Sequence, residues 1–414
     1  MRLGPTPARG PELGEPRHAG RARALALIAA ALLGCNLAAW AGIALVDARL
    51  STGRAEHNPV VAAAIAFFQP QATRITDPDL PRAPLVRAWV QWDSEWYASI
   101  AKDGYWYVPG EQSPVAFFPA YPMSIRAFHA LGLNRFVVGI LLAAVLGCGG
   151  LFLFNRWAAH LHGEERALSA TALFVGYPFA FYLFGAMYSD ALFLCAAVGA
   201  FYALERNRLL AAVLLGAVAT AARPIGPAIV LGLVARRLEL RSSAGEQIGA
   251  SDLVPALAGA GLAAYALFLW QRFGDLLAFV HVQSAPGWDH LAGASSYLKL
   301  PFWEMLAGAP TGSGALLRLL NAALAIMAFA CAIPMWRRWS RGYAVYVAVA
   351  VGMPLISSKD FMGLGRYAMA AFPSFVMLSQ LLEPRPGLRR VLMVASWVGL
   401  ALLTIAFAAG QFVA

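Results

Sequence analysis

Long apolar stretches recur from one end of the chain to the other, and short polar segments separate them. The stretches are rich in Leu, Ala, Val and Phe and lack the alternation of a membrane β-strand, so they predict transmembrane helices. We expect about eleven spans. Their ranges are 24–46, 136–157, 167–184, 189–204, 209–220, 225–236, 253–271, 313–335, 343–357, 367–383 and 391–410. The predicted fold class is all-α, a polytopic transmembrane helical bundle.

The composition agrees with a membrane protein. Of the 414 residues, 60% are hydrophobic and 13% are charged, whereas about 25% of a soluble domain is charged. A net charge of +10 would suggest a nucleic-acid partner in a soluble chain. In this chain the excess comes from Arg in short connections between apolar stretches, so we expect membrane lipids as partners and no nucleic acid.

The positions of these arginines predict the orientation. If the N-terminus is cytoplasmic, every short Arg-rich connection falls on the cytoplasmic side, as the positive-inside rule requires. The connections carry Arg166, Arg206, Arg208, Arg236, Arg237, Arg241, Arg337, Arg338, Arg341, Arg385, Arg389 and Arg390. We predict a multi-pass protein of the cell membrane, with residues 1–22 as a disordered cytoplasmic tail and 23–414 as one domain. Its large extracytoplasmic loops are residues 47–135 and 272–312.

Two places leave the topology open. Residues 115–133 are long enough to span the membrane, yet they carry two prolines, an arginine and a histidine, and counting them as a span inverts every later connection. We favour an amphipathic helix that lies at the outer interface. The short segments 209–220 and 225–236 predict either spans or half-helices that meet at Arg223.

The most polar segment of the first loop is Trp92-Asp93-Ser94-Glu95-Trp96-Tyr97. Carboxylates beside a membrane are costly and usually serve chemistry or ion binding. Asp93 is a candidate general base, and with Glu95 it is a candidate pair for a divalent cation such as Mg or Mn. The two carboxylates face one side only if the backbone is extended, and they diverge on a helix. An ordinary interfacial loop with solvated acids is the alternative.

A second polar break, Tyr188-Ser189-Asp190, interrupts an apolar stretch that runs from residue 167 to residue 204. We expect a turn at the outer surface. Asp190 either caps the next helix at its N-terminus, contributes to a site, or does both.

Cations gather on the same predicted face. Arg223, Lys359 and Arg366 lie near the outer ends of predicted spans, where Arg binds phosphate through two hydrogen bonds and Lys supplies a point charge. Snorkelling to lipid headgroups is the alternative for each of them. The aromatic residues of the first loop predict either stacking on sugar rings or anchoring at the interface. These residues are Trp92, Trp96, Tyr97 and Tyr105.

Four segments, taken in order, resemble one known family. They are residues 92–105 with Ala116-Phe117-Phe118-Pro119-Ala120-Tyr121-Pro122, then 177–193, then Ala222-Arg223-Pro224-Ile225-Gly226, and finally Gly365-Arg366-Tyr367. The first resembles the first luminal loop of the PIG-V family, the GPI mannosyltransferase 2 type within the GT-C class of membrane glycosyltransferases. The next two resemble that family's Tyr-Ser-acid turn and its Arg-Ser-Asn-Gly turn, although Pro224-Ile225 departs from the latter. The last resembles the Arg-Tyr element found late in GT-C cores.

The resemblance implies a GT-C-like fold with interfacial helices in the first loop. It implies an enzyme that transfers a sugar, expected to be mannose with arabinose and glucose as alternatives, from a polyprenyl-phosphate donor. The acceptor is a lipid, a glycan or a protein, and the active site is extracytoplasmic. By position, Asp93 is the catalytic base of an inverting reaction, Glu95 is its second acid, and Asp190 is a further acid of the site. The remaining substrate-binding candidates are Tyr188, Arg223, Lys359, Arg366 and Tyr367, beside the four aromatic residues of the first loop.

Two other functions stay open. A transporter or flippase of a glycolipid would need an internal repeat and polar residues near the bilayer midplane, whereas the acids of this chain lie at predicted outer ends. A non-catalytic subunit of an envelope-assembly complex would carry the same acids without chemistry.

Overall fold

The computed structural model describes residues 15–51, 58–71, 75–288, 293–308 and 313–413. The regular structure of these ranges is helical. The first helix begins at Glu15, so the end of the predicted disordered tail is helical, as its Ala and Arg content favours. The rest of that tail lies outside the described residues.

Both α-helices and 3-10 helices occur along the chain. The α-helices are α1 (Glu15–Leu50), α2 (Pro59–Phe68), α3 (Pro84–Trp89), α4 (Ser94–Asp103), α5 (Ala120–His129), α6 (Arg135–His162), α7 (Glu164–Val175), α8 (Asp190–Glu205), α9 (Leu209–Thr220), α10 (Gly226–Ser243), α11 (Ala260–Phe273), α12 (Ala278–His281), α13 (Ala294–Tyr297), α14 (Leu300–Ala307), α15 (Ser313–Ala330), α16 (Ala332–Arg338), α17 (Arg341–Ser357), α18 (Leu364–Ala368), α19 (Pro373–Leu382) and α20 (Pro386–Ala408). The 3-10 helices are η1 (Pro114–Ala116), η2 (Ala180–Leu183), η3 (Ala250–Gly259) and η4 (Val282–Ser284).

Among the described residues, five helical stretches are long and apolar enough to cross a bilayer. They are Ala19–Leu50, Arg135–His162, Ala250–Phe273, Gly314–Arg338 and Pro386–Ala408. Each has at least 23 residues, and about 20 suffice to span the hydrocarbon core. They confirm the predicted polytopic all-α bundle. Shorter apolar helices, among them α9, α17 and α19, occupy other predicted spans, and the total of eleven stays a prediction.

Close helix pairs hold the bundle together, chiefly α6 with α8, α10 with α17, and α1 with α20. Small residues permit this approach. A Cβ on Gly147 of α6 would lie 1.8 Å from the carbonyl oxygen of Leu183, and one on Gly342 of α17 would lie 2.5 Å from the Cα of Arg236. Glycine is therefore required where these backbones touch, as is common in the packing of membrane helices.

The predicted span 167–184 is not one helix. Helix α7 ends at Val175, and the chain makes turns and η2 before α8 begins at Asp190. The expected turn is present, but it is buried inside the protein and does not lie on its surface, because Tyr188, Ser189 and Asp190 are at most 3% exposed. Irregular backbone is tolerated in a membrane protein where other elements cover it, and in this protein α6 and α20 pack on η2.

The ambiguous segment 115–133 contains the ten-residue helix α5. At 1.5 Å per residue this helix is about 15 Å long, half of the roughly 30 Å hydrocarbon core. Its buried residues Tyr121, Pro122 and Ile125 face the helices α4 and α6 that pack against it. The length of α5 fits the predicted interfacial helix and is too short for a span.

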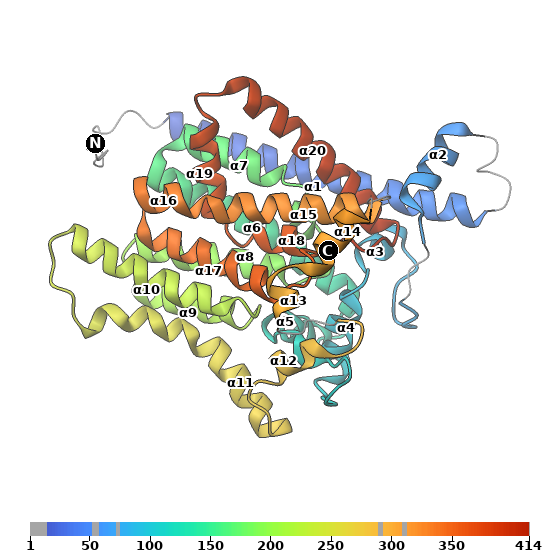
Figure 1. Ribbon diagram of the computed structural model, residues 1–414, viewed down its shortest axis with the longest axis horizontal. Helices are drawn as coiled ribbons and strands as arrows, with labels where there is room; N and C mark the ends of the chain where they lie inside the picture. The colour runs from blue at the N-terminus through green and yellow to red at the C-terminus, as the bar shows by residue number, and fades with distance from the viewer. Residues whose placement is uncertain (1–14, 52–57, 72–74, 289–292, 309–312, 414) are drawn as a thin grey trace.

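The helices of the two predicted large loops gather at one end of the bundle. Helices α2, α3, α4 and α14 lie towards the right of Figure 1, whereas α16 lies at the left. We call these two ends the α4 end and the α16 end. A second hydrophobic cluster underlies the loops of the α4 end, separate from the main core. Its buried residues are Val115, Phe118, Tyr265, Leu269, Ala278 and Val282.

Candidate active site

Four charged side chains from separate segments meet where α4 begins. Arg366 Nη1 lies 3.3 Å from Asp93 Oδ2, although 273 positions separate the two residues in sequence. Arg366 Nε lies 3.6 Å from Asp190 Oδ2, and Arg223 forms an ion pair with the other oxygen of Asp190. The contacts run in the order Asp93, Arg366, Asp190, Arg223, with alternating sign. We call this group the four-charge cluster.

Asp93 is the most accessible member of the four-charge cluster and immediately precedes α4. Its side chain is 30% exposed, against 13% for Arg366. Its backbone N–H donates to the hydroxyl of Tyr188 over 3.1 Å, and that hydroxyl donates to the carbonyl of Gln91 over 3.2 Å. Burial raises the pKa of Asp93, and the positive charge of Arg366 partly offsets that rise. A partly open carboxylate with a raised pKa fits a general base.

Asp190 and Arg223 form the buried part of the cluster. Their side chains are 2% and 4% exposed. The expected capping role of Asp190 is not realised, because Asp190 is itself the first residue of α8 and its carboxylate turns to Arg223. Arg223 lies in the turn between α9 and α10, with its guanidinium carbon 4.3 Å from the ring centroid of Tyr367. A buried ion pair is stable only if its remaining polar atoms find partners.

Arg366 is held in place by aromatic rings and by its own helix. Its guanidinium carbon lies 5.0 Å from the ring centroid of Tyr188 and 5.3 Å from that of Tyr182. The backbone N–H of Gly365 donates to Asn321 Oδ1 over 2.7 Å, which fixes the start of α18. Arg366 can therefore face both acids at once.

Within the described residues, three buried polar atoms of the four-charge cluster have no hydrogen-bond partner. They are Asp190 Oδ2, Arg223 Nη2 and Arg366 Nε. Buried polar atoms in folded proteins are nearly always paired. Two of these three atoms, Arg366 Nε and Asp190 Oδ2, face each other at 3.6 Å as an ion pair. Arg223 Nη2 is the remaining atom, a positive donor that suits an anion such as phosphate.

Glu95 does not join the cluster. The backbone of Asp93 is helical, with φ −58° and ψ −16°, and Glu95 lies in α4 and is exposed. The two carboxylates therefore diverge, as expected for a helix. The described residues contain no group of three or more His, Cys, Asp or Glu side chains placed to hold a metal. Because a guanidinium is the partner of Asp93, these donors do not fit a two-carboxylate site for Mg or Mn.

Three of the four aromatic residues expected to stack on sugars use their polar atoms inside the protein. Trp92 Nε1 donates to a backbone carbonyl after α20 over 3.1 Å, and Tyr105 donates to a backbone carbonyl of its own loop over 2.8 Å. Tyr97 is buried, and its hydroxyl shares a 3.0 Å hydrogen bond with Ser189. Trp96 is partly exposed and stacks on a neighbouring aromatic ring.

The loop before Arg366 depends on residues that the sequence analysis missed. Lys359 lies in this loop and is partly exposed. The loop is tied down by Lys299, which is 7% exposed and donates to the carbonyl of Ser358, and by Arg318, whose Nε lies 2.9 Å from Asp360 Oδ2. An arginine inside an apolar helix such as α15 was an available signal, because intramembrane charges are rare and usually functional.

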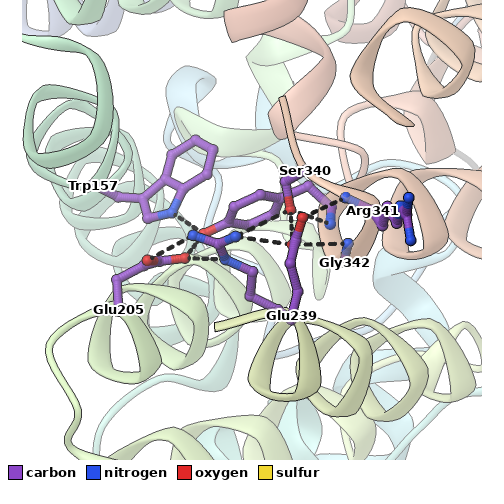
Figure 2. Close-up of polar contacts among 8 residues, drawn as sticks. Trp157, Glu205, Glu239, Ser340, Arg341 and Gly342 are labelled. Carbon is purple, nitrogen blue, oxygen red and sulfur yellow. Dashed lines mark hydrogen bonds and ion pairs between the residues drawn. The ribbon is translucent and has the colours of Figure 1, made fainter. Parts of the chain in front are cut away.

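A second charged network lies at the α16 end (Figure 2). Arg236 donates to Glu205 over 2.7 and 3.1 Å and to Glu239 over 2.8 Å. Tyr343 donates to the same Glu205 over 2.6 Å and accepts from Trp157 Nε1 over 2.8 Å. Glu239 also accepts from the backbone N–H groups at the start of α17. We call this group the Arg236 network.

Comparisons with known proteins bear on the same region. Residues 82–234 match a family model described as Mannosyltransferase (PIG-V). This match confirms the PIG-V-like character that the motifs indicated, and it supports a membrane glycosyltransferase. No curated protein matches the chain.

The crystal structure of ArnT from Cupriavidus metallidurans bound to undecaprenyl phosphate is among the similar solved structures. It aligns with a TM-score of 0.46 at 15% identity over 83% of this chain. The alignment spans 62% of the length of ArnT.

Proposed function

We propose that this protein transfers a sugar, mannose, from a polyprenyl-phosphate carrier to a hydroxyl of an envelope acceptor. The four-charge cluster carries the proposal, because it places a partly open carboxylate beside a guanidinium group and close to Arg223, whose Nη2 has no hydrogen-bond partner. Asp93, Asp190 and Arg223 all lie within the segment that matches the mannosyltransferase family model. The donor class follows from the same resemblance and from the position of the cluster at the end of a membrane helix bundle.

The proposed reaction is a single displacement at the anomeric carbon. Asp93 accepts the proton of the acceptor hydroxyl as that oxygen forms a bond to the anomeric carbon. The bond between this carbon and the phosphate oxygen breaks, and polyprenyl phosphate leaves with the bonding electrons. Attack from the face opposite the leaving group inverts the configuration.

The guanidinium groups of the cluster would stabilise the departing phosphate. Arg366 and Arg223 both carry positive charge in a site that is largely shielded from solvent, and Arg223 Nη2 has no hydrogen-bond partner. Fixed donors aimed at developing charge lower a barrier more effectively there than in water. Neither a nucleotide nor a metal enters these steps.

Asp190 has a different role from Asp93 in this scheme. It is buried and lies between the two arginines, where it orients Arg223 and Arg366. We therefore assign it as a positioning residue, and we assign Glu95 no chemical step because it is exposed and points away. The active site faces the extracytoplasmic side, as the arginine distribution predicts.

The direct test is a transfer assay with the full-length protein in proteoliposomes. The donor is synthetic polyprenyl phosphate [³H]mannose, and the acceptor pool is an envelope lipid extract from cells that lack the gene. Wild-type protein should form a labelled glycolipid or glycan product. The Asp93→Asn variant should lose about 10²- to 10⁴-fold in rate, the usual worth of a general base.

The matched control is Asp103→Asn, which removes an exposed carboxylate at the other end of α4. It should leave the rate unchanged. Full activity of Asp93→Asn would remove the assignment of the base. Movement of the labelled lipid across the bilayer without a new glycosidic bond would replace the transferase with a flippase.

A further inference from the structure

Three tryptophans from two separate loops gather one turn of α4 away from Asp93. The indole of Trp96 lies 6.3 Å from that of Trp106 and 5.8 Å from that of Trp288, measured between ring centroids. Its ring also stacks on Phe117 at 5.7 Å with an interplanar angle of 18°. We call these four rings the tryptophan platform.

The platform is joined to the active site. Phe117 makes an edge contact with Tyr97 at 5.3 Å. The hydroxyl of Tyr97 bonds to Ser189, the residue before Asp190. The platform is therefore linked through Tyr97 and Ser189 to the segment that carries Asp190.

Contacts between the two loops fix the position of Trp288. Gln112 Nε2 of the first loop donates to the carbonyl of Pro286 in the second over 3.1 Å. The intervening Gly287 has φ +93°, and a Cβ there would lie 2.6 Å from Gln112 Nε2. The backbone thus needs glycine at this turn to bring Trp288 against Trp96.

The platform presents open aromatic surface. Trp106 is 41% exposed, and Trp96 and Trp288 are partly exposed. The exposed acid Glu111 lies in the same loop as Trp106. Such surfaces suit a sugar, because one face of a pyranose ring consists of C–H groups and its edges carry hydroxyls that hydrogen-bond to carboxylates.

We infer that the tryptophan platform binds a pyranose ring of the acceptor. The inference rests on the proposed function, and it assigns the acceptor to the carbohydrates. The buried arginines mark the phosphate side of the cluster, so the acceptor must approach Asp93 from another side. Trp96 of the platform lies one turn of α4 from Asp93, and the platform lies in the more exposed loops of the α4 end.

The test measures sugar binding without turnover. Full-length Asp93→Asn protein in nanodiscs is mixed with methyl α-D-mannopyranoside. The aromatic protons of the protein are saturated, and the transfer of saturation to the ring protons of the sugar is measured by NMR. Saturation transfer from the aromatic protons to the sugar should be strong in the Asp93→Asn protein. Adding Trp106→Ala or Trp288→Ala should weaken the apparent affinity about 3- to 10-fold, as expected for losing one aromatic contact.

The matched control is Trp303→Ala, which removes an exposed indole of α14 whose N–H donates to the carbonyl of Leu298. It should leave sugar binding unchanged. The inference would be overturned if Trp303→Ala weakened sugar binding as much, or if the Asp93→Asn parent showed no saturation transfer to the sugar. It would also be overturned if the tryptophan variants lost contact with lipid and kept contact with the sugar. This measurement does not depend on catalysis. If the protein bound the sugar but had no transferase activity, only the proposed function would be contradicted.

Discussion

The four-charge cluster and the Arg236 network lie at opposite ends of one helix. Asp190 is the first residue of α8 and Glu205 is the last. With 16 residues, α8 separates them by about 24 Å. Both groups pair arginine with buried carboxylate, and both draw on α8 and on the region of α10.

They differ in how completely their polar atoms are paired. In the Arg236 network, no buried side-chain nitrogen or oxygen of the described residues is left without a partner. The four-charge cluster leaves three such atoms without a hydrogen bond, two of which face each other at 3.6 Å, and its Asp93 side chain is 30% exposed. A saturated network stabilises the native fold and offers little to a ligand. The four-charge cluster keeps a guanidinium donor, Arg223 Nη2, that has no hydrogen-bond partner and could bind a ligand.

The largest effect is expected from Glu205→Ala. Removing this carboxylate leaves Arg236 and Tyr343 buried without their main acceptor. Breaking a buried pair in this way costs about 3–5 kcal/mol of stability. Thermal unfolding of the detergent-purified variant, followed by intrinsic fluorescence, should shift to a markedly lower temperature.

Turnover per folded molecule should stay near wild type in that variant at low temperature. Glu165→Ala, an exposed acid at the same end, is the control and should unfold like wild type. An unchanged unfolding temperature for Glu205→Ala would show that the Arg236 network is not structural.

The next largest effect is expected from Arg366→Lys. Lysine keeps the positive charge but lacks the planar guanidinium whose nitrogens face both Asp93 and Asp190. Loss of one oriented donor in an active site costs about 10²-fold in kcat. We expect that loss in the proteoliposome assay, with little change in unfolding temperature. Arg126→Lys on the exposed side of α5 is the control. A variant as active as wild type would mean that charge alone suffices at position 366.

The pH profile should sharpen the comparison further. Burial raises the pKa of Asp93 and Arg366 opposes the rise. A base works when deprotonated, so kcat/KM should fall as the pH drops through this raised pKa. In Arg366→Gln the opposing charge is gone, and the acid limb should move to higher pH. The same limb in both proteins would uncouple Asp93 from Arg366.

The smallest effect is expected from Glu95→Gln and from chelation. Glu95 is exposed and diverges from Asp93, so a metal bridge between them is not expected. Each treatment should change the rate less than about twofold, far below the loss that follows removal of a catalytic metal. Rates are measured with EDTA and again after adding Mg²⁺. Restoration by Mg²⁺ after a strong loss would reinstate the two-carboxylate site.

Much of this organisation was predictable from the sequence. Long apolar runs indicated the helices, because hydrophobic length alone decides whether a helix suits a bilayer. The four members of the cluster were named because each is a charge in an apolar context. Their pairing was not predictable, since Asp93 and Arg366 are 273 positions apart and only the packed bundle brings them together.

The aromatic residues show where sequence reasoning stops. Trp92, Tyr97 and Tyr105 looked alike in the first loop, yet their polar atoms bond to protein groups. Trp106 and Trp288 carry no motif, and their role emerges only when the two loops meet at Trp96. Composition marks such residues as interfacial, whereas the choice between ligand and protein partners depends on tertiary contacts.

The segment after α20 has a consequence for the Asp93 segment. The carbonyl of Gln411 accepts from Trp92 Nε1, and Phe412 lies 5.1 Å from the Trp92 ring. Trp92 has φ +54° and directly precedes Asp93. Removal of Gln411 and Phe412 would take these contacts away from the residue that directly precedes Asp93, although neither contact is with Asp93 itself. Substitutions at Gln411 and Phe412 are therefore expected to act on the Asp93 segment from a distance in sequence.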